Sequence, residues 1–171
     1  GLWSTFAVML KKIVSGGQTG VDRGALDAAL AAGLPCGGWC PEGRLAEDGI
    51  IPERYPLREL HGGGYAERTA ANVRDSDGTL VLHFGPVTGG TRLTVEACER
   101  VGRRCLLVDG AALDPGQSAE QAAAFVQAGN IEVLNVAGPR ESQAPGAGEF
   151  ARQVVAVMLA SLGTSQPDGS T

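Results

Sequence analysis

Short apolar runs alternate along the chain with stretches of helical periodicity. Runs typical of buried β-strands lie at residues 12–15, 34–38, 79–83, 104–109 and 131–136. Apolar positions recur with helical spacing at residues 21–32, 65–75, 91–101 and 118–128, and again near the C-terminus at Phe150, Val154, Val157 and Met158. Gly33 is placed to end the first helix, and Ser118 and Gln121 form a capping box that would open the fourth.

Strands that alternate with helices predict a mostly parallel sheet with helices on both faces, which is a Rossmann-like three-layer αβα sandwich. We expect a strand order near 2-1-3-4-5, with the first and third strands as neighbours. Ligands in such folds bind beyond the C-terminal ends of the strands, where the strand order reverses. Glycine-rich loops follow the first, third and fifth strands, so all three are expected at that edge.

The length of 171 residues suits one domain. We expect this Rossmann-like domain at residues 11–162, an N-terminal tail at 1–10 and a disordered tail at 163–171. A net charge of −5 argues against general nucleic-acid binding. We see no secretory signal and no stretch long enough to cross a membrane, so we expect a cytoplasmic protein. The four cysteines and two histidines match no common metal-binding spacing, and we expect no metal site.

The first glycine-rich loop follows the first strand directly. It reads Gly16-Gly17-Gln18-Thr19-Gly20 and leads through Val21 to Asp22 and Arg23. One interpretation is an anion or ribose site, in which backbone N–H groups at a helix N-terminus bind the ligand and the polar side chains assist. The other is a tight turn, with Thr19 as N-cap and Asp22 completing a capping box. On the first interpretation, Gly17→Val should weaken ligand binding while the fold survives.

Three other polar segments are expected near the same edge or beside it. Thr88, Gly89, Gly90 and Thr91 precede or open a helix that also carries Glu96. Arg68, Asn72 and Asp75 are spaced to share one side of a helix, and Asp77 precedes the third strand. Arg140 lies in the glycine- and proline-rich loop after the last strand. Each residue taken alone is also compatible with a solvated surface or a turn.

Residues 39–59 are rich in proline, glycine and charge and predict a long ordered loop. Loops of this length inside a compact domain are usually functional. We expect the loop to close over a bound ligand, with Trp39 stacked on its ring.

Five segments together resemble a known family. They are "KIVSGGQTGVDRGALDAA", "GGWCPEGRLAEDGIIPERYPLRE", "YAERTAANVRDSDGTLVL", "GPVTGGTRLTVEA" and "LNVAGPRES". They are similar to the "putative molybdenum carrier" family, the circularly permuted YpsA-related branch of the SLOG superfamily. The resemblance implies a Rossmann-like fold, a small phosphate-bearing ligand such as a nucleotide or the molybdenum cofactor, and a homodimer or tetramer.

A more distant similarity concerns the LOG phosphoribohydrolases, which cleave the N-glycosidic bond of nucleoside monophosphates. It places Arg68, Asp77 and Glu96 on functional positions of that family, together with the glycines at 89 and 90. Thr69, Thr88, Arg92 and Leu93 depart from the family pattern. Two hypotheses follow: a binding protein, which the departures favour, or an enzyme in which Arg68 and Glu96 face one pocket.

Overall fold

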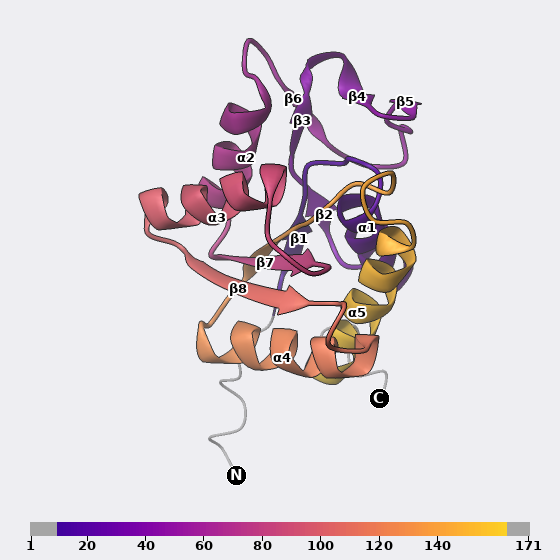
Figure 1. The fold of residues 1–171 in the computed structure, drawn as a ribbon, viewed down its shortest axis with the longest axis vertical. Helices are drawn as coiled ribbons and strands as arrows, with labels where there is room; N and C mark the ends of the chain where they lie inside the picture. Colours follow the sequence, from indigo (N-terminus) through magenta and orange to yellow (C-terminus); the bar gives the residue numbers. More distant parts are fainter. Residues whose placement is uncertain (1–9, 164–171) are drawn as a thin grey trace, which may run out of the picture.

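The computed structural model describes residues 10–163, and the chain forms a five-stranded parallel sheet with helices on both faces (Figure 1). The helices are α1 (Val21–Ala32), α2 (Tyr65–Arg74), α3 (Gly89–Val101), α4 (Pro115–Ala128) and α5 (Ala147–Leu162). The strands of the sheet are β1 (Lys12–Val14), β2 (Cys36–Gly37), β7 (Gly78–His83), β8 (Arg104–Asp109) and β9 (Val133–Ala137). The expected Rossmann-like sandwich is confirmed. The expected tails lie outside the described residues, except for their inner ends at Leu10 and Gly163.

The strand order differs from the expected one. The sheet runs β2-β1-β9-β7-β8, so the last strand lies between the first and the third. Its residues Leu134 and Val136 are fully buried, and the strand pairs in parallel with β1 on one side and β7 on the other. β8 is an edge strand, which agrees with its exposed Arg104 and Leu107.

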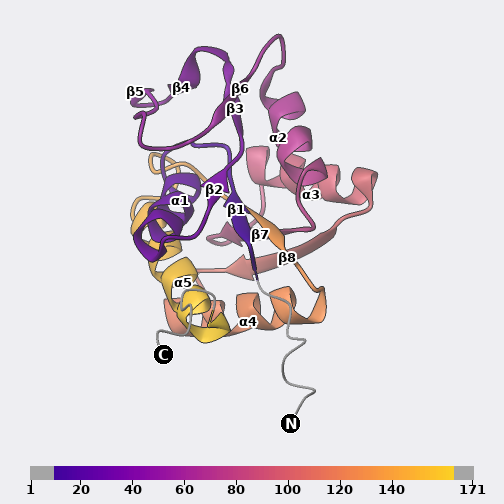
Figure 2. The same ribbon diagram turned by 180° about the vertical axis from the view of Figure 1, so that it is seen from behind.

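The helices separate onto two faces of the sheet. α1, α4 and α5 pack together on one face, and α2 packs with α3 on the other (Figures 1 and 2). The loops after β1 and β9 therefore lead to helices on one face, and the loop after β7 leads to α3 on the other. This divergence opens the C-terminal edge of the sheet between β9 and β7, where ligands bind in open α/β sheets.

Two local expectations need correction. The fourth helix begins at Pro115 rather than residue 118, because Asp114 accepts a hydrogen bond from the Gln117 N–H and Gln117 reaches back to the Asp114 N–H. Proline at the first helical position supports this earlier start.

Residues 39–59 are also not a bare loop. They contain β3 (Trp39–Pro41), which pairs in parallel with β6 (Arg58–Leu60), and a small hairpin of β4 (Leu45–Ala46) and β5 (Gly49–Ile50). A short 3₁₀ turn (Glu42–Arg44) joins the two. Ile51 and Tyr55 of this segment pack with Leu26 in a second apolar cluster, which anchors the segment to α1.

Candidate functional site

Two adjoining cavities open at the C-terminal edge of the sheet. The outer one has a volume of about 410 Å³ and is lined from the loops after β1 and β9, from α2 and from the start of α3. The inner one is small and polar and reaches down to β9. Both are lined by Asp22, Tyr65, Arg68, Gly90, Thr91 and Gly138. We call the two cavities together the Arg68 cleft.

Arg68 is the buried cation of this cleft. Arg68 is 5% exposed, and its Nη1 donates a hydrogen bond of 3.2 Å to the Gly16 carbonyl oxygen. The guanidinium also lies over the Tyr65 ring, 4.5 Å from the ring centroid. Its Nε is buried without a hydrogen-bond partner. Because buried donors in native proteins are almost always paired, an unpaired N–H in a cavity indicates a site for an acceptor.

Asp22 is the buried carboxylate of the cleft. It is 7% exposed and accepts a hydrogen bond from the Gln18 backbone N–H. Burial raises the pKa of Asp22 from 3.8 to about 6, and the positive charge of Arg68 only partly opposes the rise. The cleft thus holds a buried cation, Arg68, and a buried carboxyl group whose pKa is about 6.

The N-terminus of α3 faces the same space. Gly89, Gly90 and Thr91 line the outer cavity, and the Thr88 side chain makes no capping hydrogen bond. The first N–H groups of a helix lack intrahelical partners and carry partial positive charge. Together with Arg68 they make this end of the cleft electropositive.

The glycines of the first loop are explained by packing against protein. A Cβ on Gly16 would lie 2.7 Å from Arg68 Nη1, and one on Gly17 would lie 2.3 Å from Leu57 Cδ1. A Cβ on Gly20 would lie 2.4 Å from the Pro139 carbonyl oxygen. That same oxygen accepts from the Val21 N–H, so protein atoms already occupy part of the α1 N-terminus. The loop supports the cleft, and only part of it borders the cavity.

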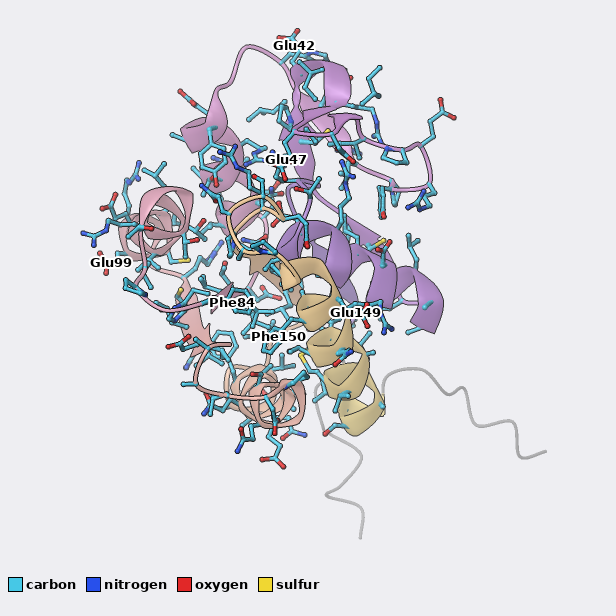
Figure 3. The ribbon with its side chains drawn as sticks, turned by 45° about the vertical axis from the view of Figure 1, so that its right-hand side comes forward. Glu42, Glu47, Phe84, Glu99, Glu149 and Phe150 are labelled. Atoms are coloured by element: carbon cyan, nitrogen blue, oxygen red, sulfur yellow. The ribbon has the colours of Figure 1, made fainter. Side chains whose placement is uncertain are left out.

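Glu47 ties the segment of residues 39–59 to the two loops beside the cleft. Its carboxylate accepts hydrogen bonds from the Thr19 hydroxyl and from the N–H and hydroxyl of Ser142, and it lies 3.5 Å from Arg140 Nε. Figure 3 shows Glu47 beside the loop that follows β9. The Ser142 and Thr19 hydrogen bonds, aided by the charge of Arg140, hold the pKa of Glu47 below its usual range.

We expect Glu47→Gln to loosen residues 45–50, because a neutral amide accepts less strongly and cannot pair with Arg140. Hydrogen exchange followed by mass spectrometry should show several-fold faster exchange in that segment. Glu53→Gln, an exposed position in the same segment, is the matched control and should leave the exchange unchanged. Equal exchange in wild type and Glu47→Gln would mean that the apolar cluster alone holds the segment.

The structure brings only part of the expected site together. The expected residues that line the cleft are Gly16, Gln18, Asp22, Arg68, Gly89, Gly90, Thr91 and Arg140. Those that do not line it are Gly17, Thr19, Gly20, Arg23, Trp39, Asp77, Thr88 and Glu96.

Several of the second group have other contacts. Arg23 pairs with Asp48. Asp77 accepts from the Glu132 and Val133 N–H groups at the opposite edge of the sheet, before β7 begins. Glu96 is exposed on α3, so it does not share a pocket with Arg68.

Sequence reasoning missed Tyr65 as a lining residue of the cleft, whereas it had already placed Asn72 on the same side of a helix as Arg68. Tyr65 lies three residues before Arg68 and Asn72 four residues after it, so all three share one face of α2. That spacing was the signal available for finding Tyr65. Leu93 and Gln143, which also line the outer cavity, carried no signal beyond their neighbours.

Fold and cleft define a Rossmann-like α/β protein with an electropositive cavity at the carboxyl edge of its parallel sheet. The profile of the circularly permutated YpsA SLOG family matches residues 13–159, and the chain belongs to that family. A crystal structure at 1.45 Å resolution of a "Putative molybdenum carrier protein" from Syntrophus aciditrophicus SB is 41% identical in sequence. The match has a TM-score of 0.85 and covers 88% of this chain and 96% of the other. No curated protein matches the chain.

Within residues 10–163, no cluster of three or more histidine, cysteine, aspartate or glutamate residues could hold a metal ion. Over the same range, no helix is long and apolar enough to cross a membrane.

Proposed function

We propose that the Arg68 cleft binds a nucleotide or nucleotide-derived ligand through its phosphate. The observation that carries the proposal is the buried Arg68, whose Nε has no hydrogen-bond partner, in a cavity that the N-terminus of α3 also lines. A guanidinium edge and free helix N–H groups are donors that suit a phosphate oxygen. The outer cavity of about 410 Å³, bordered by Tyr65 and Leu93, offers room for the organic part of the ligand.

The molybdenum cofactor, a phosphate-bearing pterin, fits this proposal as a cargo held by its phosphate. The donors in the cleft are N–H groups and a guanidinium, which suit an oxyanion rather than a metal ion bound by side chains. The name of the crystallographic relative supports the same choice. A cytoplasmic location and a homodimer or tetramer are part of the proposal.

The test is a binding assay on two variants, each of which replaces one arginine of α2. Arg68→Met should weaken the binding of AMP, ADP-ribose or phosphate about tenfold to hundredfold, because a hydrogen bond to a charged group contributes roughly 1.5–3 kcal/mol. Calorimetric titration of each ligand gives the Kd. Arg74→Met removes the same charge from an exposed position of the same helix and should leave the Kd unchanged.

Arg68 also contacts Gly16, so unfolding of the variant must be measured separately. Arg68→Lys, which keeps the charge but loses the planar set of donors, should weaken binding less than Arg68→Met. Unchanged affinity in a folded Arg68→Met protein would refute the proposal.

A hydrolase of the LOG type is the second candidate, and Asp22 is the observation in its favour. The carboxyl group that lies with Arg68 in the cleft is Asp22 rather than Glu96, and its pKa of about 6 suits a general base. Release of free adenine and ribose 5-phosphate from AMP, lost in Asp22→Asn, would establish this activity. If AMP binds and stays intact, the hydrolase candidate is refuted and the binding function is the one supported.

A further inference from the structure

Within residues 10–163, one stretch of the sheet is not closely covered by a helix. On the face that carries α2 and α3, α3 contacts β7 and β8, whereas α2 packs against α3 and β3. Parallel sheets are normally covered on both faces. At β1 the described residues leave a cavity of about 260 Å³, which the C-terminal end of α2 borders. We call it the indole cleft; it is lined by Lys12, Val14, Gly38, Trp39, Arg58, Asn72, Asp75 and Val133.

The indole cleft is separate from the Arg68 cleft. Asn72 is the residue that lines both, and it forms part of the wall between them. Neither Arg68 nor Asp22 borders the indole cleft. A ligand here would use different cations from those proposed above.

Trp39 is fixed in this cleft by its polar atoms. Its backbone N–H donates to Asn72 Oδ1 at 2.8 Å, and its carbonyl oxygen accepts from Asn72 Nδ2 at 3.0 Å. Its indole Nε1 donates to Asp75 Oδ2 at 2.8 Å. An indole oriented in this way needs no reordering before a flat ring packs on it, and pre-ordered side chains lower the entropic cost of binding.

The charge balance of the cleft favours an anion. Among the described residues neither Lys12 nor Arg58 forms an ion pair, whereas the neighbouring Lys11 pairs with Glu132 at 2.7 Å. Arg58 lies 5.9 Å from the centroid of the Trp39 ring. The one carboxylate lining the cleft, Asp75, already accepts from the indole and lies 3.7 Å from Arg74 Nε.

We propose that the indole cleft is a second ligand site, for a planar heteroaromatic anion. The ring packs against Trp39 over an apolar floor of Val14 and Val133. Its carboxylate or other anionic group lies between Lys12 and Arg58. This inference does not depend on the function proposed for the Arg68 cleft.

The probe for this site is quinoline-2-carboxylate, with uncharged quinoline as its matched partner. Binding should shift the Trp39 indole N–H resonance, which Trp39→Phe identifies by its loss. Calorimetric titration should give a Kd at least about tenfold lower for the carboxylate than for quinoline, the equivalent of one charge-assisted contact.

Variants separate this site from the rest of the protein. Lys12→Met and Arg58→Met should each weaken the carboxylate about tenfold, whereas Lys11→Met, one residue away but paired with Glu132, and Arg68→Met should not. Equal binding of quinoline and its carboxylate, or no loss in the Lys12 and Arg58 variants, would refute the proposal. A Trp39 resonance that moves only with protein concentration would show a second copy of the chain on this face and would refute it as well.

Discussion

Gly20→Ala is expected to lower the free energy of unfolding by at least about 3 kcal/mol. Gly20 adopts φ 82° and ψ −132°, a conformation that residues with a Cβ rarely accept. The added Cβ would also lie 2.4 Å from the Pro139 carbonyl oxygen and 2.7 Å from the Glu141 nitrogen. Both are backbone atoms of the loop after β9, which cannot move away as a side chain could.

The measurement is thermal and urea unfolding of Gly20→Ala beside a matched glycine. For a domain of this size the melting temperature should fall by roughly 6–12 °C. Gly33→Ala is the control: Gly33 also has a positive φ, 71°, but a Cβ added there would meet no atom of a more distant residue within 4 Å. Gly33→Ala should lower the free energy of unfolding by about 1 kcal/mol. Equal losses at the two positions would mean that backbone conformation alone, and not the contact with the β9 loop, requires glycine at position 20.

Gly17→Val follows the same reasoning. From the sequence, a loss of ligand affinity with the fold intact was the expected result. In the structure, Gly17 has φ 80° and its Cβ would meet Leu57 of the segment that covers the loop. A branched side chain there strains the backbone and displaces that segment, so the structure favours a loss of stability over a selective loss of binding.

The alternation of apolar runs and helical stretches was sufficient to predict the fold class. It could not order the strands, because β7 and β9 are both apolar and either of them suits a buried, central position. The clearest clue was β8, whose Arg104 and exposed Leu107 suit an edge strand. Pairing of Asn135 with Thr79, which fixes β9 beside β7, joins residues 56 positions apart and leaves no local sequence signal.

The lining of the cleft was predictable where one helix or one loop supplied the residues. Arg68 and the α3 N-terminus lie in the cleft as their sequence neighbourhoods indicated. Alignment to a more distant family misplaced Asp77 and Glu96, because their roles depend on which edge of the sheet and which side of a helix they occupy. Trp39 was expected over the ligand of the first loop, but its hydrogen bonds to Asn72 and Asp75 hold it near the C-terminal end of α2, in a separate cavity that Arg68 does not line.

Asp22 should make stability depend on pH in an unusual direction. Its pKa is about 6 in the folded protein and 3.8 in the reference state. Between these values the folded protein binds more protons than the unfolded chain, so the free energy of unfolding falls as the pH rises from about 4 to 6. A pKa shift of about two units corresponds to roughly 3 kcal/mol of free energy of unfolding, and this contribution is fully lost above the folded-state pKa. Asp22→Asn resembles the protonated form, so its free energy of unfolding should not fall in this way between pH 4 and 6. The difference between the wild-type and variant pH profiles separates the effect of Asp22 from that of other titrating groups.

The same titration should control the affinity of the Arg68 cleft for anions. Above pH 6 the ionised Asp22 repels a bound anion and offsets Arg68, whereas below pH 6 the neutral carboxyl leaves the Arg68 charge free and can itself donate a hydrogen bond. Sulfate is the probe, since its charge is constant between pH 5 and 8. Its Kd for wild type should rise about tenfold across that range, while the Kd for Asp22→Asn should stay low and flat. Parallel pH profiles in the two proteins would show that Asp22 does not sense the bound anion, and that its buried charge acts on folding alone.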